Sequence, residues 1–218
     1  MRIVQGFLIF FIAAFSITTT VYASSVTNVA LGKSVSLEDG AFFTAGWGGG
    51  QTANSQTVVD GVFFPKNRQW DQGPVWWDDR DGVANHVVID LNGTFTLESF
   101  IIQADDNDAY LLEHWDSGSA TWQTTWNVAN YNHTGWGMQT RPNVYNNLER
   151  HVLGSTVTTD ALRFSGNLGN SDRLFSVSEI QAFGYAAPTP VPLPAAVWLF
   201  GSSLAGLGVC RRKVKAKQ

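Results

Sequence analysis

Residues 24–187 consist of short segments rich in β-branched and aromatic residues, separated by clusters of Gly, Asn, Asp and Ser. The clearest segments are His86–Leu91, Phe100–Ala104, Tyr110–Trp115, Ala161–Phe164 and Phe175–Phe183. Such segments are typical of β-strands, and the clusters between them are typical of turns. No apolar stretch here keeps a 3.6-residue period through several turns. The pattern therefore predicts an all-β sandwich, and about 160 residues are enough for one well-buried domain.

The N-terminal residues 1–23 predict a cleaved signal peptide. Arg2 precedes an apolar stretch over residues 6–21, and Val21-Tyr22-Ala23 places small residues at the two positions that a signal peptidase reads. We expect cleavage after Ala23, so that the exported protein begins near Ser24.

The C-terminal residues predict a membrane anchor. Residues 195–210 form an uncharged stretch of sixteen residues, slightly short of the roughly 20 that a full span usually needs. A basic tail over 211–218 follows, and positive charge beside a span stays on the cytoplasmic side. We therefore expect a transmembrane helix at 195–210, a proline-rich linker at 187–194 and a domain at 24–186 outside the cytoplasm. The alternative is a buried C-terminal helix, although such a helix seldom has an uninterrupted apolar circumference.

The charge of the predicted domain excludes one class of partner. Residues 24–187 hold eight basic and 18 acidic side chains, a net charge of −10. Proteins bind nucleic acid largely through Lys and Arg on phosphates, so we expect no nucleic acid and favour a neutral or cationic partner. Cys210 is the only cysteine, so no intramolecular disulfide can form.

The sequence gives no sign of catalysis. Adjacent carboxylates such as Asp78 and Asp79 point to opposite faces of a strand, whereas glycosidases need two carboxyl groups that face each other across a bond. Neither G-x-S-x-G nor H-E-x-x-H occurs, and the four histidines show no short metal-ligand spacing. We therefore expect a protein that is not an enzyme.

Several sequence pieces in a fixed order resemble one fold family. They are Asn28–Lys33, Val59–Gly61, Trp70 with Trp77, His86–Leu91, and Ala161–Phe164 followed by Phe175–Gly184. Together they resemble the galactose-binding-like or discoidin fold, also called the coagulation factor type C domain. The resemblance implies a jelly-roll β-sandwich whose loops at one end contact sugars or lipids.

The same resemblance implies a structural calcium ion. Asp60 and Glu179 stand at the positions that supply the family's side-chain ligands. Calcium takes six to eight oxygen ligands from carboxylates and carbonyls. Glu179 also stands out as a charge inside a run of strand residues. It would be costly to bury unpaired, and the alternative is that it points to solvent.

The tail is similar to the PEP-CTERM sorting signal of Gram-negative bacteria. There a proline motif precedes a membrane segment and an Arg-rich end, here Val191-Pro192-Leu193-Pro194 and then Arg211-Arg212. Leucine stands where the namesake glutamate would be, as in a VPLPA variant. The similarity implies that an exosortase-type protease cuts the membrane-anchored precursor near Pro194 and passes the domain to the cell surface or extracellular matrix.

Tryptophans set among Gly and Pro are the candidate sugar contacts. They are Trp47, Trp76 with Trp77, and Trp136. Glycine on both sides of a tryptophan favours an exposed loop, and an exposed aromatic face can stack on a sugar ring. Arg80, His133 and Arg141 are candidate polar partners, with ordinary surface salt bridges as the alternative. Trp70, Trp115 and Trp122 lie in or beside strand patterns and favour core packing.

An acidic cluster, Asp105, Asp106 and Asp108, lies between two predicted strands. It is compatible with a second ion site, a sugar contact or an ordinary Asx-rich turn. Two functions follow from the whole chain. The protein either binds a polysaccharide or surface glycan without catalysis, or serves as an adhesive matrix protein with no defined small ligand.

Overall fold

The computed structural model describes residues 25–46, 51–131, 136–169 and 172–188, together with Leu199 and the pair 202–203. The predicted signal peptide, the sorting motif Val191–Pro194 and the basic residues Arg211 and Arg212 lie outside the described residues, as do Trp47 and His133. Among the described residues, no helix has the length and apolar character required to cross a bilayer.

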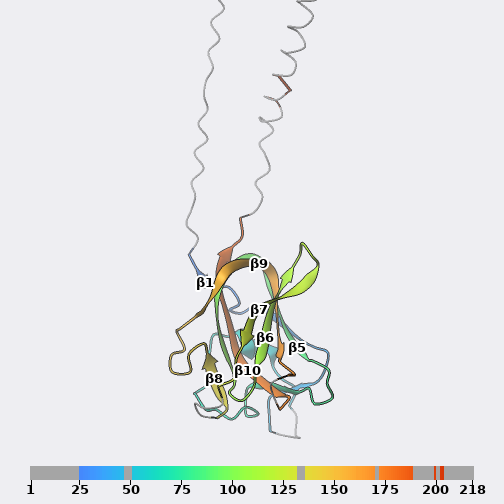
Figure 1. Ribbon diagram of the computed structural model, residues 1–218, viewed down its shortest axis with the longest axis vertical. Helices are drawn as coiled ribbons and strands as arrows, with labels where there is room; N and C mark the ends of the chain where they lie inside the picture. Colours follow the sequence, from blue (N-terminus) through green and yellow to red (C-terminus); the bar gives the residue numbers. More distant parts are fainter. Residues whose placement is uncertain are drawn as a thin grey trace, which may run out of the picture.

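The described residues form ten strands and one short 3-10 helix (Figure 1). In chain order they are β1 (Thr27–Asn28), β2 (Ser34–Glu38), β3 (Phe42–Phe43), η1 (Ser55–Val59), β4 (Val75–Asp78), β5 (His86–Asp105), β6 (Tyr110–Asp116), β7 (Thr121–Val128), β8 (Met138–Arg141), β9 (His151–Gly166) and β10 (Leu174–Ala186). The prediction of an all-β fold is confirmed, and the five predicted strand segments all lie within strands.

The long strand β5 runs through both layers of the sandwich. Its first part, at 86–90, pairs with β2 and with the end of β9. Its second part, at 95–104, pairs with β10. Between the two parts the register with β9 shifts, and Asn92 and Gly93 adopt positive φ angles of 50° and 141°. Asn and Gly accept such angles most readily, so this pair forms the corner at which β5 bends from one layer into the other.

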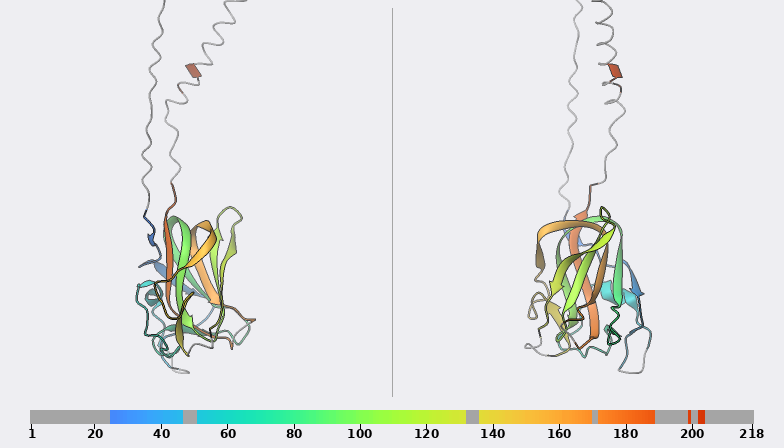
Figure 2. Two further views of the ribbon diagram at one scale, coloured as in Figure 1. Left: turned by 60° about the vertical axis from the view of Figure 1, so that its left-hand side comes forward. Right: turned by 45° about the vertical axis from the view of Figure 1, so that its right-hand side comes forward.

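The core lies between the two layers, which Figure 2 shows from two sides. Alternation along the start of β5 buries Val87, Ile89 and Leu91 on one face, as a period of two requires. At the centre of the core the ring of Tyr110 stacks on Phe164, with centroids 5.0 Å apart. Its hydroxyl donates to the Ser176 carbonyl oxygen at 3.0 Å, so its one polar group is satisfied inside the core.

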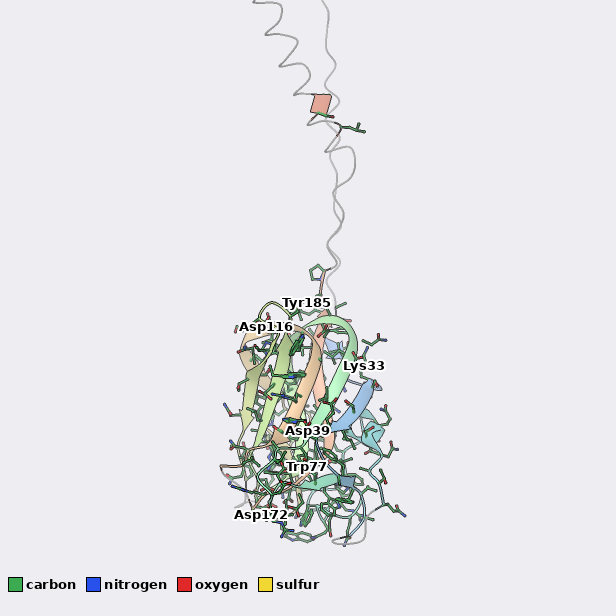
Figure 3. The ribbon with its side chains drawn as sticks, turned by 90° about the vertical axis from the view of Figure 1, so that its right-hand side faces the viewer. Lys33, Asp39, Trp77, Asp116, Asp172 and Tyr185 are labelled. Carbon is green, nitrogen blue, oxygen red and sulfur yellow. The ribbon has the colours of Figure 1, made fainter. Side chains whose placement is uncertain are left out.

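The two ends of the sandwich differ in what they carry. The first strand β1 pairs with the last part of β10, so the chain enters and leaves the domain at one end. Tyr185 and Asp116 mark that end in Figure 3, whereas Trp77 and Asp172 lie toward the opposite end. The connections around β4 and between β5 and β6 lie at this opposite end, and they contain the candidate site (Figure 1).

Candidate functional site

A pocket of about 360 Å³ lies where β5 ends and β8 begins. Its walls are formed by Gln69, Trp70, Asp105, Asp106, Asn107, Trp136 and Gly137. We call it the Trp136 pocket. Its volume lies within the range of small-molecule sites, and its lining combines two indole rings with carboxyl and amide groups.

Close backbone packing sets one wall of the Trp136 pocket. The Asn67 amide donates to the Met138 carbonyl oxygen at 3.0 Å, and the Met138 amide donates to the Arg68 carbonyl oxygen at 2.8 Å. Gly137 has a positive φ of 69°, and a Cβ atom added there would collide with the Arg68 carbonyl group. Only glycine therefore suits this position, next to the exposed tryptophan.

Trp136 is the exposed aromatic side chain of the pocket. Its exposed fraction is 59%, which is unusual for so large an apolar group. Trp70, on the other wall, is only partly buried and packs edge-on against Trp76, with ring centroids 5.4 Å apart. The expectation that Trp136 is exposed is confirmed, whereas Trp70 lines the pocket instead of lying wholly in the core.

The two aspartates of the pocket are mostly buried. Asp105 is 4% exposed, and its Oδ1 atom has no hydrogen-bond partner among the described residues. Burial, and next the charge of Asp106, raises the pKa of Asp105 from 3.8 to about 7. Burial also raises the pKa of Asp106, while a hydrogen bond from the Gly137 amide acts to lower it. The pocket wall therefore contains a buried acceptor oxygen that has no hydrogen-bond donor among the described residues.

Asp108 is the most enclosed acid of the predicted cluster. It has no exposed surface, and neither carboxyl oxygen has a hydrogen-bond partner in the described part of the chain. Burial, followed by the charges of Asp172 and Asp105, raises its pKa from 3.8 to about 8. All three acids of the cluster are thus buried, while the choice among an ion site, a sugar contact and an ordinary Asx-rich turn stays open.

Arg141 supports the pocket from inside the fold. It was a candidate ligand contact, but it is completely buried, so this prediction is wrong. Nη1 donates to the carbonyl oxygens of Ala104 and Gln139 at 2.6 and 2.8 Å, and Nη2 donates to those of Asp105 and Asp106 at 2.6 and 3.4 Å. Nε donates to the Ala129 carbonyl oxygen at 3.4 Å. All five N–H groups of the guanidinium are thereby directed at backbone carbonyls, which ties the end of β5 to β8.

Two other predicted tryptophans also belong to the core. Trp76 and Trp77 lie in β4 and are buried, so the prediction of an exposed loop is wrong for both. In β4, Trp77 pairs in register with Phe42 and Phe175. Its Nε1 donates to Asp79 Oδ2 at 3.1 Å. These long-range partners cover the indole from both sides.

Arg80 forms a surface salt bridge, which was the alternative to its role as a ligand contact. Its Nη2 lies 2.6 Å from Asp78 Oδ2, and about half of its side chain is exposed. It does not line the Trp136 pocket. Of the predicted contacts that the structure describes, only Trp136 lies together with the acidic cluster.

Asp60 and Glu179 lie close together, as a shared ion site requires. Glu179 has no exposed surface, and the Gly61 amide donates to its Oε1 and Oε2 at 3.1 and 3.2 Å. Burial is the main cause that raises the pKa of Glu179 from 4.5 to about 8, and the nearby Asp60 raises it further. No described cluster of three or more His, Cys, Asp and Glu side chains could hold a metal. An ion here would need carbonyl oxygens or water beside these two carboxylates.

Sequence reasoning missed part of the pocket wall. Gln69 and Asn107 contribute side-chain amides, and Gly137 contributes the close backbone approach. Nothing in the local sequence places Trp70 opposite Trp136, since 65 residues separate them.

Comparison with known proteins identifies the fold. No protein-family model and no curated protein matches the sequence. Among solved structures, a fucolectin from striped bass (Morone saxatilis) serum aligns with a TM-score of 0.52 at 13% identity, over 77% of this chain and 52% of that one. The chain therefore has the galactose-binding-like jelly-roll fold, and the predicted fold class is confirmed.

Two bacterial binding modules also align, with lower scores. A chitosan-binding module from a Paenibacillus sp. IK-5 chitosanase/glucanase has a TM-score of 0.45 at 16% identity, over 72% of this chain and 99% of the module. The family 32 carbohydrate-binding module of Clostridium perfringens NanJ, solved with galactose, has a TM-score of 0.44 at 11% identity, over 74% and 99%. Both neighbours are described as carbohydrate-binding modules.

Proposed function

We propose that the protein is a non-catalytic carbohydrate-binding module that holds a glycan in the Trp136 pocket. The observation that carries the proposal is an exposed indole beside a buried carboxyl oxygen without a partner. The ring of Trp136 can cover the apolar face of a pyranose. Asp105 Oδ1 can then accept a hydrogen bond from a sugar hydroxyl, and the amides of Gln69 and Asn107 can both donate and accept.

The rigidity of the surroundings favours binding over catalysis. Arg141 and the hydrogen bonds between β8 and the 67–68 segment hold the pocket wall in place before a ligand arrives. A preformed site loses less conformational entropy on binding, which favours affinity. The paired acids Asp105 and Asp106 are neighbours on one wall instead of facing each other across a cleft, as a glycosidase would need.

A matched pair of tryptophan variants tests the glycan site. Trp136→Ala removes the ring contact and should weaken glycan binding by roughly ten- to a hundredfold, because the free energy lost is about that of burying one aromatic side chain. Trp122→Ala, in β7 next to the opposite end of the sandwich, is the control and should bind normally. The measurement is a glycan array followed by titration of tryptophan fluorescence. A blank array with the folded wild-type protein would favour the adhesive matrix function instead.

Calcium at Asp60 and Glu179 forms a second part of the proposal. The two residues fit a cation because Glu179 is fully buried and lies near the carboxylate of Asp60, and the hydrogen bonds from the Gly61 amide and the Gln181 side chain bring no full positive charge to it. Bound calcium would supply positive charge that neutralises both carboxylates. Asp60 directly follows η1 and Glu179 lies in β10, so the ion would fasten the 60–61 loop to the sheet.

Export and sorting complete the proposal and rest on the sequence alone. The precursor would enter the membrane through residues 195–210 and be processed by an exosortase-type protease near Pro194. Replacing Pro192 and Pro194 in the native host should leave full-length protein in the inner membrane, as detected by fractionation and immunoblotting. Normal release of this variant to the surface would contradict a processed sorting signal.

A further inference from the structure

We propose that the Trp136 pocket selects a sugar that carries a free amino group, so that its preferred ligand is a cationic hexosamine polymer. This inference rests on the proposed glycan site and adds the charge of the ligand to it. The geometry points to an ammonium group that hydrogen-bonds Asp105 Oδ1 while Trp136 covers the sugar ring.

The described lining of the pocket is negatively charged and contains no Lys or Arg side chain. Asp105 and Asp106 are its charged residues, and no Lys or Arg stands beside them in the described lining. As whole residues, both are more than nine-tenths buried. A buried carboxylate without a cationic partner is costly, and this cost falls when a ligand brings positive charge to it.

Arg141, behind the pocket, offsets only part of the negative charge of the acids around it. Its five N–H groups are used on backbone carbonyl oxygens, and it is completely buried. The charges that act on Asp105 come from Asp106, Arg141 and Asp172. Asp108 adds a further repulsion within the same cluster, because Asp105 raises its pKa in turn. Burial is the main cause that raises the pKa of Asp105 to about 7, and the charges of Asp106 and Asp172 raise it further while the charge of Arg141 lowers it.

The pocket suits an amino sugar better than a metal ion or a lysine side chain. No described group of three or more His, Cys, Asp and Glu side chains forms a metal site. A volume of about 360 Å³ with tryptophans on two walls is large for a single alkyl chain but appropriate for a ring. A hexosamine supplies both the apolar ring face and the ammonium donor.

The test compares two oligosaccharides with the same sugar backbone, one with free, charged amino groups and one with these groups acetylated and neutral. The full chain, in a detergent without a sugar headgroup, is titrated calorimetrically with a glucosamine tetramer and with the N-acetylglucosamine tetramer at pH 5, 6 and 7. We expect the glucosamine tetramer to bind at least about tenfold tighter at pH 6. Its affinity should rise from pH 5 to pH 6, because Asp105 begins to ionise, and should level off toward pH 7, where the sugar amine begins to lose its proton, while the affinity for the acetylated tetramer stays flat.

Variants test whether the preference for the glucosamine tetramer arises in the Trp136 pocket. Asp105→Asn should bring the ratio of the two affinities close to one, and Asp106→Asn should reduce it if the first variant does not fold. Asp116→Asn makes the same change near the opposite end of the sandwich (Figure 3) and should keep the wild-type ratio.

Three results would overturn the inference. Equal affinity for the two tetramers, with both lost in Trp136→Ala, refutes the charge preference and leaves the proposed glycan site standing. Equal binding of a lysine tetramer refutes recognition of the sugar ring. Absence of binding to either tetramer and to every glycan on an array removes the proposed function together with this inference.

Discussion

In the metal-free protein, we expect the free energy of unfolding to fall as the pH rises from 4.5 to about 8, because Glu179 is buried. Replacing Glu179 with glutamine should remove most of this fall. In the fold, burial and the nearby Asp60 raise the pKa of Glu179 from 4.5 to about 8. Below pH 4.5 the carboxyl group is neutral in both folded and unfolded chains. As the pH rises further, the unfolded chain loses this proton first, so the native state is progressively destabilised until about pH 8. At about 1.4 kcal/mol for each tenfold change, the total is of the order of 5 kcal/mol.

Glutamine has nearly the same shape and no charge, so the variant lacks this contribution. The other acids with raised pKa values, such as Asp108, remain in both proteins and cancel in the comparison. Calcium should act in the opposite sense. It binds the ionised carboxylate and should stabilise the wild type at pH 8, but not the glutamine variant.

The assay is urea unfolding followed by tryptophan fluorescence at pH 5, 6, 7 and 8, with a chelator and then with calcium. Glu98→Gln makes the same change at a partly exposed glutamate of β5 and serves as the control. The reasoning about Glu179 fails if Glu179→Gln has the pH slope and calcium response of the wild type. A wild-type protein with the expected pH slope but no calcium response would refute the metal site alone.

Three further predictions concern the residues around the pocket. Arg141→Lys should lower the free energy of unfolding by about 3–5 kcal/mol, because one ammonium cannot serve five carbonyls and a buried charge stays poorly paired; a urea midpoint near the wild-type value would refute this. Gly137→Ala should cost about 1–3 kcal/mol and weaken glycan binding, because its backbone has positive φ and its new Cβ meets the Arg68 carbonyl group. The check is calorimetric melting with glycan titration, and unchanged values contradict it. Asp108→Asn should leave the melting temperature near pH 4 almost unchanged and raise it at pH 8, since the native pKa of about 8 penalises the ionised acid. A variant that is less stable at pH 8 would show that the charge has a partner.

The sequence predicts the fold well because strand patterning is local. Alternation in His86–Leu91 identifies its buried face, and the structure buries Val87, Ile89 and Leu91 as expected. The join between this segment and Phe100–Ala104 could not be predicted in the same way. Whether Asn92 and Gly93 end a strand or bend it depends on β9, which continues alongside β5 on both sides of the corner.

The site is predicted less completely because exposure depends on distant residues. Trp76, Trp77 and Trp136 all stand near Gly or Pro in the sequence, yet only Trp136 is exposed. What covers Trp77 comes from β3 and β10, which are far away in the chain. The residues next to Arg141 in the sequence are polar and do not indicate that it is buried. Its burial depends on the carbonyl groups of Ala104 in β5 and of Ala129, which accept hydrogen bonds from it.

The course of β10 determines how the domain would carry mechanical load. β10 begins at Leu174, toward the end that contains the Trp136 pocket, and finishes at Ala186, where the chain leaves the sandwich (Figure 1). A glycan held in the pocket and a chain held beyond Ala186 would therefore pull along this strand. Its hydrogen bonds to β5 run across the direction of pull, so force would load them together in shear instead of opening them one at a time. A sandwich tethered in this way should resist detachment under flow better than one pulled from neighbouring ends.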